Sequence, residues 1–370
     1  SIYQAQFNYE QHGEWKGTIL KKSLDSHGNV DHDNPEWSAG LLLNEKGSDR
    51  RKIWTVLGNG KADYFGDWNN WVTKNVTDIN NLFEYTGVEV ADFHNTTSSL
   101  SGHLNDLEDG NDDDKEGLIN FVRGKDYFDY DGNHVINEDR DWLLGDIYHS
   151  QLVDVGPPNA KTEFTNLNQE AYWRTINNYR SFKRSMSNRN RIIYAGANDG
   201  MLHAFDSETG DELWGFIPPF IVSKLPVIMQ KDLDGVVGVQ NGGGTNPIFA
   251  VDGSPVIHDM FINGLKMSDG KTWEDTPCWR TILMVPYGRG GPGFSVLDVT
   301  NPLITPNQGP MHMFSVFNDS INSTVFIADR DGNVKERSYN QSTYNVGESL
   351  EALQADSNLC LLYTSPSPRD

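Results

Sequence analysis

Residues 191–219, RIIYAGANDGMLHAFDSETGDELWGFIPP, constrain the fold of this chain more than any other stretch. Runs of β-branched, aromatic and other apolar residues predict three strands here, at residues 192–194, 201–205 and 212–217. The sequences NDG at 198–200 and SETG at 207–210 predict tight turns, because Gly accepts the positive φ that such turns require. Three short antiparallel strands with Trp214 in the last are typical of one β-propeller blade; the alternative is a solitary meander in another β domain.

Composition agrees with many short strands. The chain has 370 residues, of which 37% are hydrophobic, and it contains 35 Gly and 16 Pro. Few aliphatic residues and many turn formers argue against a helical bundle. The 10 Trp and 14 Tyr residues can still close a core, because each ring buries a large area. We therefore expect an all-β fold, a modified β-propeller of short antiparallel meander blades with helical and loop insertions, incomplete at both ends.

Charge and cysteine content exclude several classes of protein. With 52 acidic and 30 basic residues, the chain has a formal charge of −22 and repels phosphate backbones, so no nucleic acid partner is expected. No apolar run approaches the roughly 18 residues of a membrane-spanning helix, so no integral membrane segment is expected. The two cysteines, Cys278 and Cys360, provide neither a disulfide scaffold nor a zinc site.

Further strands are predicted on both sides of the blade-like segment. On the N-terminal side they are residues 15–20, 37–43 and 51–57, with a turn at 25–29. On the C-terminal side they are residues 249–258, 281–287 and 294–299, followed by a final hairpin within 323–338 that turns at Asp331-Gly332. Residues 61–142 predict an acidic insertion with short helices, including 117–123, and a solvated acidic loop at 105–116.

Residues 162–189 are predicted to be helical, with a basic end. Its aromatic and apolar residues recur at helical spacing: Tyr172, Trp173, Ile176 and Tyr179. Such a stripe is typical of a helix face that packs into a core. The basic residues follow it: Arg180, Lys183 and Arg184.

The ends of the sequence bound the expected domain. We interpret residues 1–355 as one partial β-propeller domain. Residues 356–370 are expected to be a non-native tail, because LLYTSPSPRD matches no periodicity in the rest of the chain and resembles translated sequencing adapter. The chain starts Ser-Ile-Tyr, without an initiator Met or a signal peptide, so we expect both native termini to be missing.

The second part of the chain contains four distinctive blocks. They are LLGDIYHS at 143–150, YAGANDGMLHAFD at 194–206, VDGSPV at 251–256 and GGPGFSVLDVTNP at 290–302. In this order and spread, they resemble the β-propeller domain of the PilC/PilY family of type IV pilus biogenesis factors and pilus-tip adhesins.

The resemblance implies the C-terminal propeller of a large secreted protein, exported through the periplasm and outer membrane to the cell surface and pilus tip. It implies pilin and minor pilin subunits as partners, together with host or surface receptors, and roles in pilus assembly, adhesion and twitching motility. The family's variable N-terminal adhesive region and the later blades with its calcium loop are absent from this sequence. No functional residue of the family is therefore carried over.

Residues 129–137, DYDGNHVIN, resemble the start of an EF-hand-type calcium loop, with oxygen ligands at the spacing that surrounds Ca²⁺. His134 replaces the usual Gly, and Arg140 stands where the closing acidic residue belongs, so the closing carboxylate is expected from a shifted position. The candidate calcium ligands are Asp129, Asp131, Asn133, Val135, Asn137, and Asp139 or Asp141. The alternative is a polar hairpin with an Asp-Gly turn. The similar DRDGN at 329–333 runs straight into a strand and is predicted to be a hairpin.

No catalytic set emerges from the sequence. There is no nucleophile elbow, and His149-Ser150 are only neighbours in the chain. His203 is expected to be a packed or edge residue, and Asp199 and Asp206 are expected to serve turns. We therefore expect a non-enzymatic, calcium-binding pilus protein.

Two other functions stay open at this point. NDGMLHAFDSETGDELW at 198–214 resembles the Trp-bearing repeat of pyrroloquinoline-quinone dehydrogenases, but such enzymes repeat the motif in most blades and this chain has one good copy. An outer-membrane assembly scaffold of propeller type is the other alternative.

Overall fold

The computed structural model describes residues 1–8, 16–57, 67–83, 112–127, 133, 135, 137–165, 168–226, 248–262, 277–306, 308–330 and 332–339. Within these residues the strands form sheets of three, five and six strands. The fold is mostly β, with antiparallel meanders, as the sequence predicted.

The five-stranded sheet contains the segment that constrained the fold. Its strands, in spatial order, are β4 (Ile53–Trp54), β8 (Glu212–Phe216), β7 (Leu202–Asp206), β6 (Ile192–Gly196) and β5 (Val153–Val155). The predicted meander β6-β7-β8 is confirmed, and Gly200 (φ 99°) and Gly210 (φ 81°) occupy the predicted turns. The sequence did not predict that β4 would pair with β8 in parallel, because these strands lie far apart in the chain.

The six-stranded sheet is one continuous meander. Its strands are β9 (Val256–Ile262), β10 (Cys278–Pro286), β11 (Gly293–Asp298), β12 (Met311–Asp319), β13 (Thr324–Ala328) and β14 (Val334–Ser338). The final hairpin is confirmed, while Asp331 of its turn lies outside the described residues. The strand predicted at 249–258 begins only at Val256. Before Val256 the backbone is not part of a strand. It is held instead by a hydrogen bond from the Asp252 N–H to the carbonyl of Tyr287, the residue after β10, at 3.1 Å.

The three-stranded sheet consists of β1 (Ile2–Asn8), β2 (Lys16–Lys22) and β3 (Trp37–Ser38). The prediction of a strand over 37–43 was wrong, because β3 is followed at once by helix α1 (Ala39–Lys46). Its Leu, Glu and Lys residues favour a helix. The helix ends at Gly47, whose φ of 74° places its N–H on the Leu43 carbonyl.

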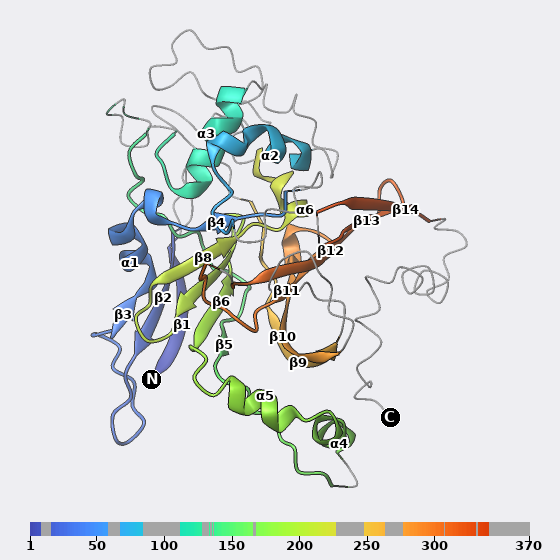
Figure 1. The fold of residues 1–370 in the computed structure, drawn as a ribbon. Helices are drawn as coiled ribbons and strands as arrows, with labels where there is room; N and C mark the ends of the chain where they lie inside the picture. The colour runs from blue at the N-terminus through green and yellow to red at the C-terminus, as the bar shows by residue number, and fades with distance from the viewer. Residues whose placement is uncertain are drawn as a thin grey trace.

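The three sheets stack face to face, following one another from left to right in Figure 1. Alternation along β6 shows why the middle sheet is buried on both sides. Ile192 and Tyr194 pack toward the six-stranded sheet, with Leu283 and Leu297. Ile193 and Ala195 pack toward the three-stranded sheet and α1. Successive sheets packed in this way are the arrangement of neighbouring propeller blades.

Helices of the insertion cover one end of the stacked sheets (Figure 1). They are α2 (Val76–Phe83) and α3 (Asp112–Arg123), packed with the short α6 (Pro219–Val222). Part of the acidic run predicted to be a solvated loop, residues 112–116, instead begins α3. Acidic side chains are favourable in a helix's first turn, and buried Leu118 and Phe121 anchor the rest. Short 3₁₀ helices occur at Ser48–Arg50, Thr73–Asn75 and Gly288–Gly290.

The helix predicted over 162–189 is two short helices, α4 (Gln169–Ile176) and α5 (Tyr179–Ser185). Asn178 separates them in the left-handed region, with φ of 56°, so the two helix axes differ. The expectation of one buried aromatic face was also wrong. Tyr179 is fully buried, but Tyr172 and Ile176 are 51% and 54% exposed. No helix of the described residues is long and apolar enough to cross a bilayer.

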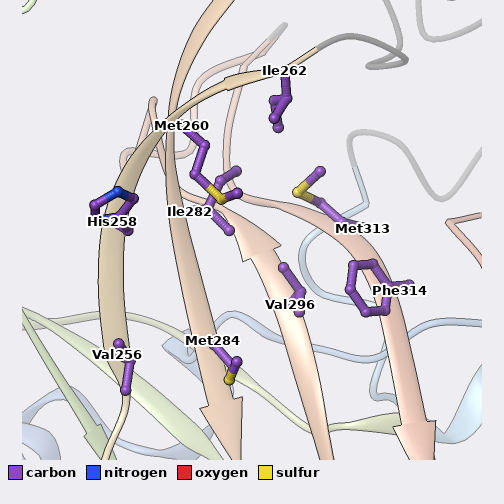
Figure 2. A pocket seen from close by; sticks show the side chains of 9 residues that line it. All are labelled: Val256, His258, Met260, Ile262, Ile282, Met284, Val296, Met313 and Phe314. Atoms are coloured by element: carbon purple, nitrogen blue, oxygen red, sulfur yellow. The ribbon is translucent and has the colours of Figure 1, made fainter. Parts of the chain in front are cut away.

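A hollow of about 130 Å³ lies on the face of the six-stranded sheet opposite the core that it shares with the five-stranded sheet. Figure 2 shows the side chains that line this hollow. Alternation along β9, β10 and β11, together with the irregular register around Met313 in β12, places the lining on one face of the sheet: Val256, His258, Met260, Ile262, Ile282, Met284, Val296, Met313 and Phe314. The lining is almost entirely apolar, so this is a packing surface and not a centre for polar chemistry.

Candidate functional site

The four sequence blocks meet in space at the junction of the sheets. The Gly145 N–H of the first block donates to the Asp199 carboxylate of the second at 3.0 Å. The Asn198 side-chain amide donates to Asp146 at 2.7 Å, and the Gly196 N–H donates to the Ser150 hydroxyl at 3.0 Å. A Cβ on Gly145 would lie 2.6 Å from that of Asp199, so only glycine allows this approach.

The third and fourth blocks join the same junction. Asp252 accepts hydrogen bonds from the His149 N–H at 3.3 Å and pairs with its imidazole Nδ1 at 2.6 Å. A Cβ on Gly290 would lie 1.7 Å from the Ala250 carbonyl oxygen, so this position also requires glycine. The Trp214 indole donates to the Pro302 carbonyl at 2.9 Å. The blocks are therefore parts of one junction, which we call the block junction.

A fully buried charge cluster lies beside the block junction. It consists of Arg51, Asp199, His203 and Glu212, and is called the charge cluster below. The Arg51 guanidinium binds the Glu212 carboxylate with both oxygens engaged, at 3.0 and 2.8 Å. His203 places Nδ1 2.8 Å from Glu212 and Nε2 3.1 Å from both oxygens of Asp199.

The pKa shifts in the charge cluster follow from its two cations and two anions. Burial alone would raise the pKa of Glu212, but Arg51 and His203 outweigh burial and lower it far below its usual range. Burial alone would lower the pKa of His203, but the carboxylates of Asp199 and Glu212 raise it to about 9. The cluster is therefore fully ionised and neutral as a whole, which is the condition for burying charges.

Arg123 extends the charge cluster to the insertion. Its guanidinium donates to the carbonyls of Arg51 at 2.9 Å and Trp71 at 2.8 Å, while Arg51 donates in return to the Arg123 carbonyl at 2.9 Å. Burial, with repulsion from Arg51, lowers the pKa of Arg123 to about 10. The end of α3 is thus tied to the central sheet through side chains that satisfy buried carbonyls.

We predict that stability falls as pH rises from about 6.5 to about 9 because of His203. The folded-state pKa of about 9 lies above the usual 6.5, so this stabilisation is complete below 6.5 and is lost as pH rises through 9. One proton sets a slope of at most about 1.4 kcal/mol per pH unit. Urea unfolding across this range should show the slope in the parent and not in His203→Gln. Equal slopes in both proteins would contradict it.

Asp146 has the other strongly shifted carboxyl at the block junction. Burial, opposed by the Asn198 hydrogen bond and reinforced by Asp199, raises its pKa to about 6. A raised pKa in a cleft often marks a catalytic acid. Asp146 is instead buried, and its carboxylate accepts the hydrogen bond from Asn198 in the second block. This carboxyl therefore serves the packing of the blocks.

The structure places only part of the predicted calcium loop. Asp129 and Asp131 lie outside the described residues. Asn133, Val135 and Asn137 are exposed, and the Asn133 side chain accepts from the Val135 N–H at 2.8 Å, which is an Asx-type turn.

The two acids considered for closing the calcium loop differ in their surroundings. Asp139 accepts from the Ser48 N–H at 3.0 Å and pairs with Lys125 at 3.1 Å, so other groups already hold its carboxylate. Asp141 is exposed. Arg140 is buried, and its guanidinium lies 4.2 Å from the centre of the Phe121 ring. The calcium site stays a prediction.

Sequence reasoning found some of these residues and missed others. Asp199 and Asp206 do serve turns, accepting from the Met201 N–H at 3.2 Å and the Glu208 N–H at 2.8 Å. His203 is packed, as expected, but its charged partners were missed. The only sequence signals were Arg51 and Glu212 themselves, charged residues at the borders of apolar strands. Within the described residues, no three His, Cys, Asp or Glu side chains are arranged to hold a metal ion.

The stacked meander sheets and the block junction define a protein of the β-propeller class. The chain belongs to the PilY1 beta-propeller domain family, whose family model matches residues 144–348. That range contains nearly all of the four blocks and both large sheets except β4.

Several known proteins resemble the chain. The type IV pilus biogenesis factor PilY1 of Pseudomonas aeruginosa strain UCBPP-PA14 is 29% identical over 303 residues, covering 81% of this chain and 21% of that protein. The chain thus spans about a fifth of the length of this relative. The crystal structure of the P. aeruginosa PilY1 C-terminal domain has 23% identity and a TM-score of 0.26, covering 51% of this chain and 38% of that chain. The 1-butanol dehydrogenase (quinone) of Thauera butanivorans is 38% identical over 61 residues, covering 16% of this chain and 10% of that enzyme.

Proposed function

We propose that this chain is the propeller part of a type IV pilus biogenesis factor, which supports pilus assembly, adhesion and twitching motility without catalysing a reaction. The observation that carries the proposal is the match of the PilY1 propeller family across 144–348. The Pseudomonas aeruginosa UCBPP-PA14 relative, whose alignment covers 81% of this chain, is named a type IV pilus biogenesis factor. Pilin and minor pilin subunits are the proposed partners, together with host or surface receptors. The proposed location is the cell surface or pilus tip, reached through the periplasm and outer membrane.

The chemistry of the block junction supports a scaffold. The polar groups that a reaction centre would need are engaged with one another: Asp199 with His203, Asp146 with Asn198, and Asp252 with His149. Most of these side chains are buried, so they hold the sheets in register instead of facing a substrate. A rigid set of stacked sheets suits a protein that presents surfaces to partners.

Gene deletion tests the pilus role directly. Deleting the gene for this chain in its source organism is expected to reduce pilin in the sheared surface fraction and to shrink the twitching zone. The full-length gene should restore both, and the same gene with Arg51→Met should restore less, because that change disrupts the scaffold. Normal surface piliation and motility after deletion would contradict the proposal.

A quinone-dependent dehydrogenase is the second candidate. The identity to the Thauera butanivorans enzyme favours it, but this identity spans 61 residues, the length of about one blade. Titration with pyrroloquinoline quinone and calcium distinguishes the two functions. The pilus role predicts unchanged Trp fluorescence, whereas saturable quenching and dye reduction with an alcohol would support the dehydrogenase.

We propose that residues 129–141 bind calcium. Asp131→Ala is expected to abolish a calcium-dependent rise in melting temperature, because it removes a charged ligand from a hard-cation site. Melts of the parent and the variant, each with chelator and with calcium, measure the effect.

Asp329→Ala is the matched control for the calcium prediction. The Asp329 carboxylate accepts from the Asn333 N–H at 2.9 Å in a similar Asp-Asn loop. Its loss should lower the melting temperature equally with and without calcium. A parent protein whose melting temperature does not respond to calcium would contradict the calcium site.

A further inference from the structure

Helix α4 and the segment before it expose a cluster of large apolar side chains. Phe164, Tyr172 and Ile176 are 52%, 51% and 54% exposed, and Trp173 is 38% exposed. Isolated exposed apolar residues are ordinary, but a contiguous group of aromatic ones marks an interaction site. We call Phe164, Tyr172, Trp173 and Ile176 the aromatic patch, and residues 161–165 and 168–185 the arm. Figure 1 shows α4 and α5 projecting beyond the stacked sheets.

The aromatic patch is held in place by specific contacts. The Thr175 hydroxyl donates to the Thr162 carbonyl at 2.7 Å, and Arg180 donates to the Thr162 hydroxyl at 3.2 Å. These bonds fix the segment that places the Phe164 ring 5.2 Å from that of Tyr172. A patch on ordered backbone loses little entropy when it binds a partner.

The arm is also anchored to the body of the protein. Tyr179 packs against Trp279 with ring centres 4.7 Å apart, and the Trp279 indole donates to the Asn177 carbonyl at 2.7 Å. Trp173 meets Phe261 of β9 edge to face at 6.4 Å. The helices therefore present the aromatic patch from a fixed base.

The arm has the opposite charge to the rest of the chain. It carries five basic and two acidic residues, whereas the chain as a whole has a formal charge of −22. Arg174 pairs with Glu170 along α4. Four other cations form no ion pair with another residue that the structure describes: Lys161, Arg180, Lys183 and Arg184. A surface that combines exposed aromatic rings with cations can bind a partner segment in two ways at once. The rings contact apolar side chains of the partner, and the cations attract its carboxylates.

We propose that the arm is a docking site for a short acidic segment of a partner protein that also carries apolar side chains. The apolar side chains pack on Phe164, Tyr172 and Ile176, and the carboxylates face the cations of α5. A short segment is favoured over a membrane or a nucleic acid, because an extended anionic surface also meets the acidic remainder of this chain. Charges beyond about 10 Å are screened in salt, so a short peptide senses mainly the arm. The inference depends on the arm alone and is independent of the proposed pilus role.

Fluorescence anisotropy with labelled peptides tests the proposal. The probe is a short peptide of Glu, Leu, Phe and Ser, compared with one in which Ser replaces Leu and Phe and with one in which Lys replaces Glu. The intact chain should bind the first probe at least about tenfold more tightly than either comparison peptide, equivalent to about 1.4 kcal/mol. Ile176→Ser and Tyr172→Ser should each weaken binding by about tenfold, and Arg180→Glu with Lys183→Glu should weaken it and flatten its salt dependence.

Leu41→Ser is the matched control, since Leu41 is also apolar and is 56% exposed, but on α1. Binding should be unchanged in this variant, and melting temperatures should show that all variants fold. Absence of probe binding, or binding that the arm variants do not change, would overturn the proposal. Equal binding to phosphatidylglycerol vesicles would assign the arm to lipid. Self-association in sedimentation that Ile176→Ser removes would assign it to a second copy, and either result would overturn the partner-segment proposal.

Discussion

Arg51→Met is expected to lower the free energy of unfolding by about 3–5 kcal/mol, because it takes the bidentate cationic partner from the buried Glu212 carboxylate and leaves the charge cluster with one net negative charge. Both side chains of this pair are fully buried, and the closest nitrogen and oxygen atoms lie 2.8 Å apart. The change also removes the donor to the Arg123 carbonyl, so the end of α3 loses a contact with the central sheet. The loss should therefore exceed that of ordinary surface substitutions several-fold.

Urea unfolding of the parent, Arg51→Met, Glu212→Gln and the double variant measures this effect. The double variant should be more stable than the sum of the single losses predicts, because each single change leaves the buried charge cluster with an uncompensated charge. Arg191→Met is the matched control. Arg191 pairs with Asp154 at the same 2.8 Å, but its side chain is 49% exposed, so its loss should cost less than about 1 kcal/mol. Equal losses for Arg51 and Arg191 would show that burial does not set the strength of the pair.

Trp214→Ala is expected to lower the free energy of unfolding by about 3–5 kcal/mol through a cavity between two sheets. The Trp214 ring is fully buried in the core shared by the five- and six-stranded sheets, with ring centres 5.8 Å from Tyr194 and 6.1 Å from Trp54. Its indole also satisfies the Pro302 carbonyl in the fourth block. The change thus removes apolar packing and a hydrogen bond that joins the sheets.

Trp214→Phe separates the two contributions. It keeps most of the ring but leaves the Pro302 carbonyl without its donor, so it should cost about 1–3 kcal/mol. Trp173→Ala, on the arm, is the control and should cost less than half of the Trp214→Ala value, since that ring is 38% exposed. Urea unfolding measures all three. A Trp214→Ala loss no larger than that of Trp173→Ala would contradict the view that this ring joins neighbouring sheets.

Both predictions concern contacts between segments that are distant in sequence, and the sequence anticipated them unevenly. The meander from β6 to β8 was predicted because its strands and turns are local, and NDG and SETG specify their turns within a few residues. The last hairpin, β13 and β14, was predicted for the same reason. The strand expected at 37–43 failed because Trp37 and Leu43 are equally compatible with a two-residue strand that leads into a helix.

Arm and insertion show where periodicity misleads. Tyr172, Trp173, Ile176 and Tyr179 have helical spacing, yet the break at Asn178 turns Tyr179 inward while the others stay exposed. Periodicity identifies a stripe on a helix but not the element that covers it. The acidic residues at 112–116 were interpreted as solvated loop because charge dominates their composition, whereas the apolar residues that follow recruit them into α3.

The candidate sites divide in the same way. Residues 129–137 could be proposed as a calcium loop from spacing alone, because such loops are contiguous in sequence. The charge cluster could not, since Arg51 lies 161 residues from Glu212 and nothing in the local sequence pairs them. The four blocks were recognisable as a set, but the hydrogen bonds that join the first block to the second and third became evident only in the folded chain.

The sequence by itself determined the all-β class, the central blade-like meander and the family, because turns, alternation and block order are properties of neighbouring residues. The tertiary structure alone decided the parallel pairing of β4 with β8, the burial of Arg51 with Glu212 and the exposure of the aromatic patch. These features depend on which distant segments share a face. The free-energy contribution of a charged or aromatic side chain depends strongly on whether it is buried, and the residue type alone does not specify that.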